Sequence, residues 1–275
     1  MPRPDFRSLL WSASRRVYMH ARGEGRNEMT TNGELDLQHR ALDTAPADVP
    51  LVVLDVGANY GLWTLASADR AGLRPDARFV AFEPIPSIHD ALVARLAAHP
   101  AAARLHVVRA ALSDAPGTAE MSVSTGGNSS LGVAFAGAEA TAATVDVNTL
   151  DLYCAAEGIE RVRLVKCDAE GFDFEVVRGS RRMFDEERID LFQFEYNHRW
   201  MAQRWFLRDV FERFRGTPYA VGKICAGRIE VYDEWHPEME RFFEANYLIA
   251  HRRALPDVAP QYGRVGRRNA WRALA

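Results

Sequence analysis

The residues best suited to chemistry form two short polar clusters, each directly after an apolar run. Asp168-Ala169-Glu170-Gly171 follows the run 162–167, and Glu195-Tyr196-Asn197-His198 follows the run 189–194. If both runs are parallel strands, the clusters meet at one edge of the sheet, where open α/β folds bind ligands. Histidine changes charge near neutral pH, so His198 is a candidate general base, with Asp168 beside it; Glu170 is the alternative base if its surroundings are dry.

The same clusters allow a different use. Asp168, Glu195 and Asn197 offer hard oxygen atoms of the kind that Mg²⁺ prefers. A divalent ion there would bind and activate an acceptor oxygen. The non-functional alternative is that these residues are surface acids and a structural histidine. Because polar clusters follow two neighbouring strands and not just one, this alternative is less favoured.

A glycine-containing turn supplies a second constellation. Leu54-Asp55-Val56-Gly57-Ala58-Asn59-Tyr60-Gly61 ends an apolar strand in an acid and two glycines, and residues 62–70 are expected to form the helix that follows. The dinucleotide fingerprint is absent because Asn59 stands where its second glycine belongs. An acid before the turn favours a cationic ligand such as S-adenosylmethionine, which has no phosphate. The residues expected to contact this ligand are Asp55, Gly57, Asn59 and Gly61, although such a sequence pattern also arises by chance.

Two further strand ends extend this ligand site. Glu83 closes the apolar run 78–82 and lies 22 residues after Gly61, close to the spacing of about 20 expected for a ribose-binding acid. A carboxylate there can accept hydrogen bonds from both ribose hydroxyls. Ser113 or Asp114, after the third strand 105–108, is a candidate adenine contact, but the Ser113–Gly117 stretch reads equally well as an ordinary turn.

The elements that must position these residues indicate one α/β domain. We expect an N-terminal helical arm or cap over 1–50, the main domain over 51–253, and a basic tail over 254–275. The tail is expected to be disordered and solvated; the less favoured alternative is that it contacts an anionic substrate or a lipid surface. The net charge of −3 gives no case for nucleic acid. Three cysteines without a paired motif favour a reduced, cytoplasmic protein, and the sequence has no transmembrane segment or signal-peptide core.

With these residues in view, the sequence resembles the FkbM family of S-adenosylmethionine-dependent methyltransferases over roughly 50–200. The resemblance rests on four stretches, with Phe194-Glu195 as a fifth match: 54–61, Phe82-Glu83-Pro84, Thr149-Leu150-Asp151 and 165–171. It implies a Rossmann-like class I fold, with a seven-stranded, mostly parallel sheet, an antiparallel last strand and helices on both faces. Cys167, Ala169 and Asp173 depart from the family pattern without disturbing the expected ligands.

The resemblance further implies methyl transfer to a hydroxyl of a sugar, glycolipid or other natural-product scaffold. S-adenosylmethionine would be the donor and a small molecule or glycan the acceptor, with Mg²⁺ left open. Methylation of a peptide or protein, and a non-catalytic S-adenosylmethionine-binding module, are the alternatives. The sequence leaves open the acceptor, the identity of the base, and whether the chain forms a homo-oligomer.

Overall fold

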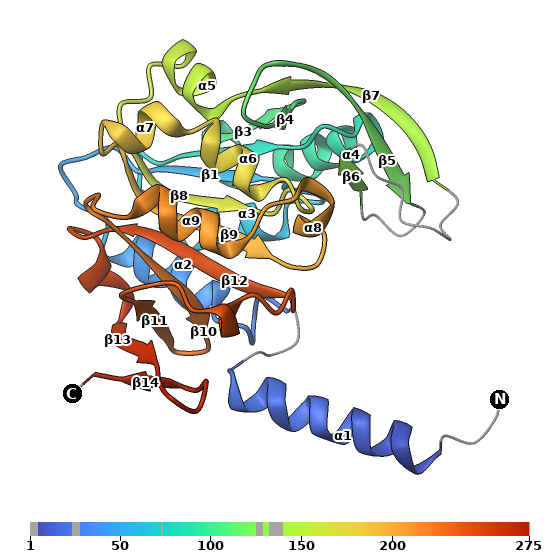
Figure 1. Cartoon of the computed structure of the whole chain (residues 1–275). Coiled ribbons are helices and arrows are strands. Elements are labelled where there is room, and N and C mark those ends of the chain that lie inside the picture. The colour runs from blue at the N-terminus through green and yellow to red at the C-terminus, as the bar shows by residue number, and fades with distance from the viewer. Residues whose placement is uncertain (1–4, 24–27, 73, 125–128, 132–139, 275) are drawn as a thin grey trace.

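A ten-stranded sheet forms the centre of the computed structural model, which describes residues 5–23, 28–72, 74–124, 129–131 and 140–274 (Figure 1). Its strand order is β14-β13-β11-β10-β12-β9-β8-β1-β2-β3. These strands are β1 (Val52–Val56), β2 (Arg78–Phe82), β3 (Leu105–Val108), β8 (Val162–Cys167), β9 (Ile189–Tyr196), β10 (Tyr219–Cys225), β11 (Arg228–Tyr232), β12 (Ala245–His251), β13 (Pro260–Val265) and β14 (Trp271–Ala273).

The pairing directions explain where a ligand site can form. β1 pairs in parallel with both β2 and β8, while β3 and β9 continue the parallel run on either side. β12 runs antiparallel between β9 and β10. The expected antiparallel strand is therefore present, but the predicted count of seven strands is wrong, because β11, β13 and β14 extend one edge.

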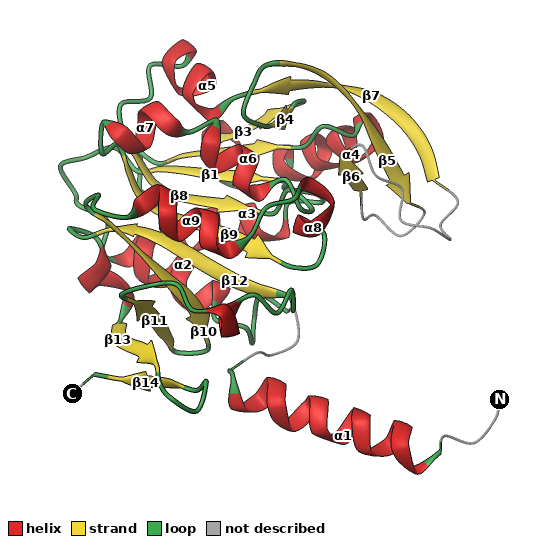
Figure 2. Ribbon diagram, viewed as in Figure 1, coloured by secondary structure: helices red, strands yellow, loops and turns green. Residues whose placement is uncertain are grey.

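Helices connect the strands (Figure 2). They are α1 (Phe6–Ala21), α2 (Glu34–Asp43), α3 (Leu62–Ala71), α4 (Pro86–Ala97), α5 (Leu150–Ala156), α6 (Asp173–Arg178), α7 (Arg181–Asp185), α8 (Trp200–Gln203) and α9 (Leu207–Phe214), with the short 3₁₀ turns η1 (Ala102–Arg104), η2 (Pro237–Met239) and η3 (Leu255–Val258). The helices described from α1 to α9 are each too short or too polar to cross a lipid bilayer.

Alternate residues of β1 enter two different hydrophobic clusters, as expected of a strand buried on both sides. Val52, Leu54 and Val56 pack in a cluster that includes side chains of α5, α6, α7 and α9. Val53 packs in a second cluster with side chains of α2, α3 and α4. The centre of the sheet is thus held from two directions, and the polar residues after each strand are left at its carboxyl edge.

A small second sheet lies beside this edge. Its order is β4-β7-β5-β6, with β4 (Ala111–Leu112), β5 (Gly117–Ser124), β6 (Ser129–Leu131) and β7 (Ala140–Asn148). The long β5–β7 pair arches over α4 (Figure 1). Because β4 pairs with β7, the chain leaves the main sheet directly after β3.

The two ends of the chain differ from the expected arm and tail. In the arm, α2 packs against the sheet through Leu37, Ala41 and Leu42, whereas α1 buries no side chain; residues 1–4 and 24–27 of the predicted arm lie outside the described part. The prediction of a disordered tail is wrong, because β13 pairs in parallel with β11 and β14 pairs with β13. The main sheet therefore continues to Ala273.

Candidate active site

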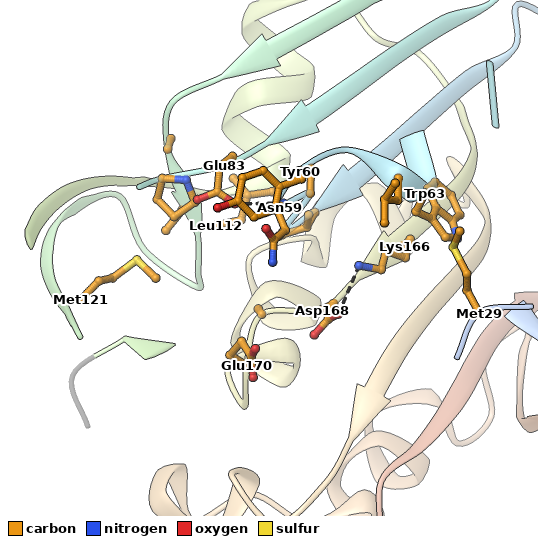
Figure 3. A pocket seen from close by; sticks show the side chains of 18 of the residues that line it. Met29, Asn59, Tyr60, Trp63, Glu83, Leu112, Met121, Lys166, Asp168 and Glu170 are labelled. Carbon is orange, nitrogen blue, oxygen red and sulfur yellow. Dashed lines mark hydrogen bonds and ion pairs between the residues drawn. The ribbon is translucent and has the colours of Figure 1, made fainter. Parts of the chain in front are cut away.

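A pocket of about 440 Å³ opens at the carboxyl edge of β1, β2 and β8 (Figure 3). The turn after β1, the acid after β2 and the cluster after β8 supply most of its wall, and segments before β1 close one side. The lining residues are Met29, Glu34, Val56, Gly57, Ala58, Asn59, Tyr60, Leu62, Trp63, Glu83, Pro84, Ala110, Ala111, Leu112, Met121, Lys166, Asp168, Ala169 and Glu170.

The turn after β1 depends on its glycines. Gly57 and Gly61 both have φ of +76°, a left-handed conformation that costs other residues energy. A Cβ on Gly57 would lie 2.1 Å from the backbone oxygen of Asp168, so only glycine lets β1 and β8 approach this closely. Gly61 does not line the pocket. It starts α3 and packs against Leu92, where a Cβ would lie 2.4 Å from Cδ1.

Glu83 is buried in the pocket wall and is held by the backbone. Its Oε2 accepts a hydrogen bond from the Asn59 N–H at 3.0 Å, and its Oε1 accepts one from the Ile85 N–H at 2.9 Å. Burial raises the pKa of Glu83, although these two N–H groups act against the shift. Each carboxylate oxygen has two lone pairs, so both can still accept a hydroxyl from a ligand.

Lys166 is a buried cation among several carboxylates. Its Nζ donates to Asp168 Oδ2 at 3.2 Å and lies 3.7 Å from Asp55 Oδ1. Burial alone would lower the pKa of Lys166, but Asp168, Asp55 and Glu34 outweigh it and the pKa is raised. Lys166 is therefore charged at neutral pH.

Asp55 stands behind the pocket wall and does not line it. Its Oδ2 accepts a hydrogen bond from Thr64 Oγ1 at 2.6 Å, whereas its buried Oδ1 accepts none from the residues that the structure describes and lies 3.7 Å from Lys166 Nζ. Burial raises the pKa of Asp55. Direct donor contact by Asp55 thus stays a prediction, and its visible contacts place it beside Lys166 and Thr64.

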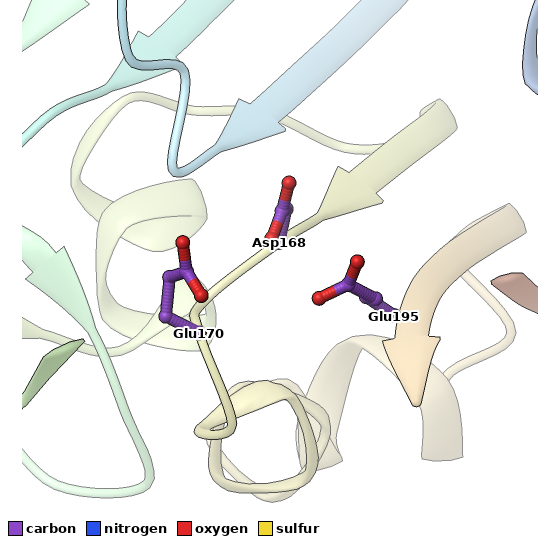
Figure 4. Close-up of side chains that lie close together, drawn as sticks. All are labelled: Asp168, Glu170 and Glu195. Atoms are coloured by element: carbon purple, nitrogen blue, oxygen red, sulfur yellow. The ribbon is translucent and has the colours of Figure 1, made fainter. Parts of the chain in front are cut away.

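Three acids converge beside the pocket (Figure 4). One carboxylate oxygen from each of Asp168, Glu170 and Glu195 lies within 4.8 Å of the others. Burial, followed by the charges of Asp168 and Asp173, raises the pKa of Glu195 well above the usual range of a glutamate. Arg199 forms an ion pair with Glu170.

This arrangement fits Mg²⁺ poorly. Lys166 and Arg199 already pair with two of the three carboxylates, Asp168 and Glu170, and so supply positive charge where a metal ion would have to bind. Asn197, expected as a ligand, is engaged elsewhere: its Nδ2 donates to Glu195 Oε2 at 2.6 Å and its Oδ1 accepts the Arg199 N–H at 2.8 Å. We therefore derive no catalytic step through a metal ion.

Besides Asp55, Gly61, Glu195 and Asn197, three further predicted residues do not line the pocket. His198 is exposed in the turn after β9. Ser113 lines a different, shallower hollow, and Asp114 forms an ion pair with Arg178 at 2.9 Å. The physical reason is the exit of the chain into the β4–β7 pair, which leaves Ala110, Ala111 and Leu112 at the pocket instead.

The pocket residues that sequence reasoning missed include Met29, Glu34, Trp63 and Lys166. Glu34 begins α2 and accepts hydrogen bonds from Gln193 Nε2 at 2.8 Å and Asn246 Nδ2 at 2.9 Å. Trp63 is buried, and its Nε1 has no hydrogen-bond partner. A lysine inside a predicted buried strand, two residues before Asp168, was the available signal for Lys166.

Comparison with known proteins identifies similar chains. The model of the "Methyltransferase FkbM domain" family matches residues 55–249. The "Methyltransferase sdnD" of Sordaria araneosa is 30% identical over 168 residues, which cover 50% of this chain and 62% of that protein. The chain thus spans less than two thirds of the length of this curated relative.

Solved structures also resemble the fold at low identity. A crystal structure of "Methyltransferase FkbM" from Methylobacillus flagellatus KT is 16% identical, with a TM-score of 0.46, covering 77% of this chain and 47% of that one. The N-terminal domain of human METTL16 in complex with SAH is 11% identical, with a TM-score of 0.44, covering 79% and 68%.

Proposed function

This chain belongs to the methyltransferase FkbM domain family, and from that premise we propose that it is an S-adenosylmethionine-dependent O-methyltransferase. Its acceptor would be a hydroxyl of a sugar, glycolipid or other natural-product scaffold. The observation that carries the proposal is the pocket itself, where a glycine turn, a backbone-held Glu83 and a set of buried acids face one cavity.

The charges in the pocket suit this donor. The acids Glu34, Glu83, Asp168 and Glu170 line it, against Lys166 as the one cation among the described lining residues. S-adenosylmethionine presents a sulfonium, an ammonium and a carboxylate. We assign its carboxylate to Lys166 and its cationic groups to the acids, while Glu83 binds the ribose. Ala110, Ala111 and Leu112 offer an apolar surface for the adenine.

Because the methyl group on the sulfonium is already activated, the protein mainly has to align it with the acceptor oxygen. The acceptor oxygen attacks the methyl carbon, the carbon–sulfur bond breaks, and its electron pair stays on sulfur. Orientation of this kind is worth about 7–11 kcal/mol. The hydroxyl proton must leave during attack, and a carboxylate within hydrogen-bond reach can accept it.

Two carboxylates are placed for this role. Asp168 and Glu170 both line the pocket, whereas the expected base His198 does not. Asp168 forms an ion pair with Lys166, and Glu170 forms one with Arg199. We assign the base to one of these two acids.

The test follows a labelled methyl group from S-adenosylmethionine into fractionated host extract, with wild type, Glu83→Ala and Asp168→Asn. We expect label in a glycan, glycolipid or small-molecule fraction. Glu83→Ala should lose S-adenosylhomocysteine binding. Either Asp168→Asn or the further variant Glu170→Gln, whichever removes the base, should lose transfer while still binding it. Label in protein would overturn the hydroxyl acceptor, and tight binding without transfer to any isolated acceptor would indicate a sensor.

A further inference from the structure

Helix α1 is exposed from Phe6 to Val17 and partly covered only near its C-terminal end. Among its sixteen residues, Phe6–Ala21, the structure buries none. The side chains of Phe6, Trp11 and Val17 are 80%, 69% and 70% exposed. Figure 1 shows the helix standing away from the sheet, with only its C-terminal end close to the domain.

The apolar residues of α1 form a continuous stripe. Phe6, Leu10, Ala13 and Val17 recur at intervals of four, three and four residues, which places them on one face of a helix. Leu9 widens the stripe, and both Leu9 and Leu10 are 55% exposed. An exposed apolar stripe of this kind marks a surface that binds another protein or a membrane.

The charge of α1 is opposite to that of the remaining chain. Phe6–Ala21 contains Arg7, Arg15 and Arg16 and no acid. Because the whole chain carries −3 at pH 7, these three positive charges leave −6 on the rest. At helical spacing Arg7 and Arg16 flank the apolar stripe on either side and Arg15 lies opposite it, while Trp11 lies between Arg7 and Arg15.

Contacts at the C-terminal end keep α1 extended from the domain. The Tyr18 hydroxyl donates to Glu238 Oε1 at 3.0 Å, and the Tyr18 ring packs edge-on against Phe243 at 6.1 Å. Arg15 also stacks over Phe243 at 5.1 Å. These contacts hold the end of the helix and leave the stripe from Phe6 to Val17 free.

We propose that α1 docks the protein on a membrane surface that carries anionic lipids. A helix with an aromatic and aliphatic face and arginines beside it lies in the interface plane, with its apolar face among the acyl chains. Anionic headgroups attract the arginines and repel the acidic remainder, so α1 meets the lipid first. A second copy of α1 is a poorer occupant, because it would bring three more arginines against the first three.

The test is co-sedimentation of the full chain with vesicles of phosphatidylcholine alone and of phosphatidylcholine mixed with phosphatidylglycerol. We expect binding to the anionic vesicles, weakened at high salt. Arg7→Gln/Arg16→Gln should weaken it by about 25-fold, at about fivefold for each arginine. Leu10→Glu should weaken it by at least about tenfold through lost apolar burial.

Matched controls lie on other helices. Arg181→Gln/Arg208→Gln removes the same charge from α7 and α9, and Leu152→Glu alters an exposed leucine of α5. Both controls should bind vesicles like wild type. Since α1 buries no side chain, its variants should also keep the melting temperature and the S-adenosylhomocysteine affinity of wild type.

Several results would overturn the proposal. These are no binding to anionic vesicles, equal binding to both vesicle types, or equal losses in the controls and the α1 variants. Self-association that Leu10→Glu abolishes, without vesicle binding, would assign the stripe to a second copy instead. The vesicle measurement needs no methyl transfer, so it stands or fails separately from the proposed activity.

Discussion

Replacing Glu83 by glutamine tests the proposed donor site at a single atom. Each carboxylate oxygen already accepts one backbone N–H, from Asn59 and Ile85. One oxygen of the pair becomes an NH₂ group in Glu83→Gln, which removes an acceptor for one ribose hydroxyl and sets a donor against a backbone donor. Hydrogen bonds to a charged group contribute about 1.5–3 kcal/mol, so the Kd for S-adenosylhomocysteine should rise about 10–100-fold.

Calorimetry with S-adenosylhomocysteine and its 2′-deoxy and 3′-deoxy analogues separates ribose contact from general damage. The analogue that lacks the hydroxyl bound by Glu83 should bind wild type more weakly than S-adenosylhomocysteine does. For Glu83→Gln, the difference in affinity between these two ligands should be much smaller. Glu212→Gln, on the exposed face of α9, is the matched control and should behave as wild type. If the variant lost the same factor for the complete ligand and for both analogues, Glu83 would act only by holding the turn, and the ribose assignment would be refuted.

Three further predictions concern the turn, a buried acid and metal ions. Gly57→Ala should lower Tm by at least about 4 °C and abolish S-adenosylhomocysteine binding in calorimetry, because its Cβ meets the Asp168 backbone oxygen at 2.1 Å; an unchanged Tm would contradict this. Burial raises the pKa of Asp173 from 3.8 to about 7, so the unfolded chain ionises this group first and the free energy of unfolding falls by up to about 4 kcal/mol between about pH 4 and 7. Urea melts should show that the free energy of unfolding changes less steeply with pH in Asp173→Asn than in wild type. An equal dependence on pH in both proteins would refute the assignment. A chelator should leave methyl transfer unchanged, because Lys166 and Arg199 already pair with two acids of the cluster; loss of turnover restored by Mg²⁺ would show otherwise.

The turn after β1 could be predicted because its signals are local. Gly57, Asn59 and Glu83 lie within one strand–turn–helix and the strand after it, and neighbouring parallel strands bring them together. Their residue types and spacing therefore carry the geometry. The apolar runs that became β1, β8 and β9 were equally readable from the sequence.

The remaining features depend on pairings between distant residues. Ser113 left the pocket because its N–H bonds to Asn148 O at 2.9 Å, beside the β4–β7 pair, and this partner is far away in sequence. The arginine-rich composition of the tail favoured a solvated segment, but β13 pairs with β11. No local sequence pattern in the tail indicates this pairing. Glu34 joined the site through Gln193 and Asn246, so its role depended on tertiary contacts.

The position of Glu34 also bears on how this chain can be recombined with its relatives. Glu34 lies before the family match at 55–249, yet its buried carboxylate is held by Gln193 and Asn246 inside that match. A chimaera that exchanges only the first fifty residues would break these two hydrogen bonds wherever the incoming arm lacks a glutamate at this position, at a cost of about 1–3 kcal/mol for each buried amide left without its partner. A segment exchange with a relative should therefore carry the arm together with β9 and β12, which hold Gln193 and Asn246.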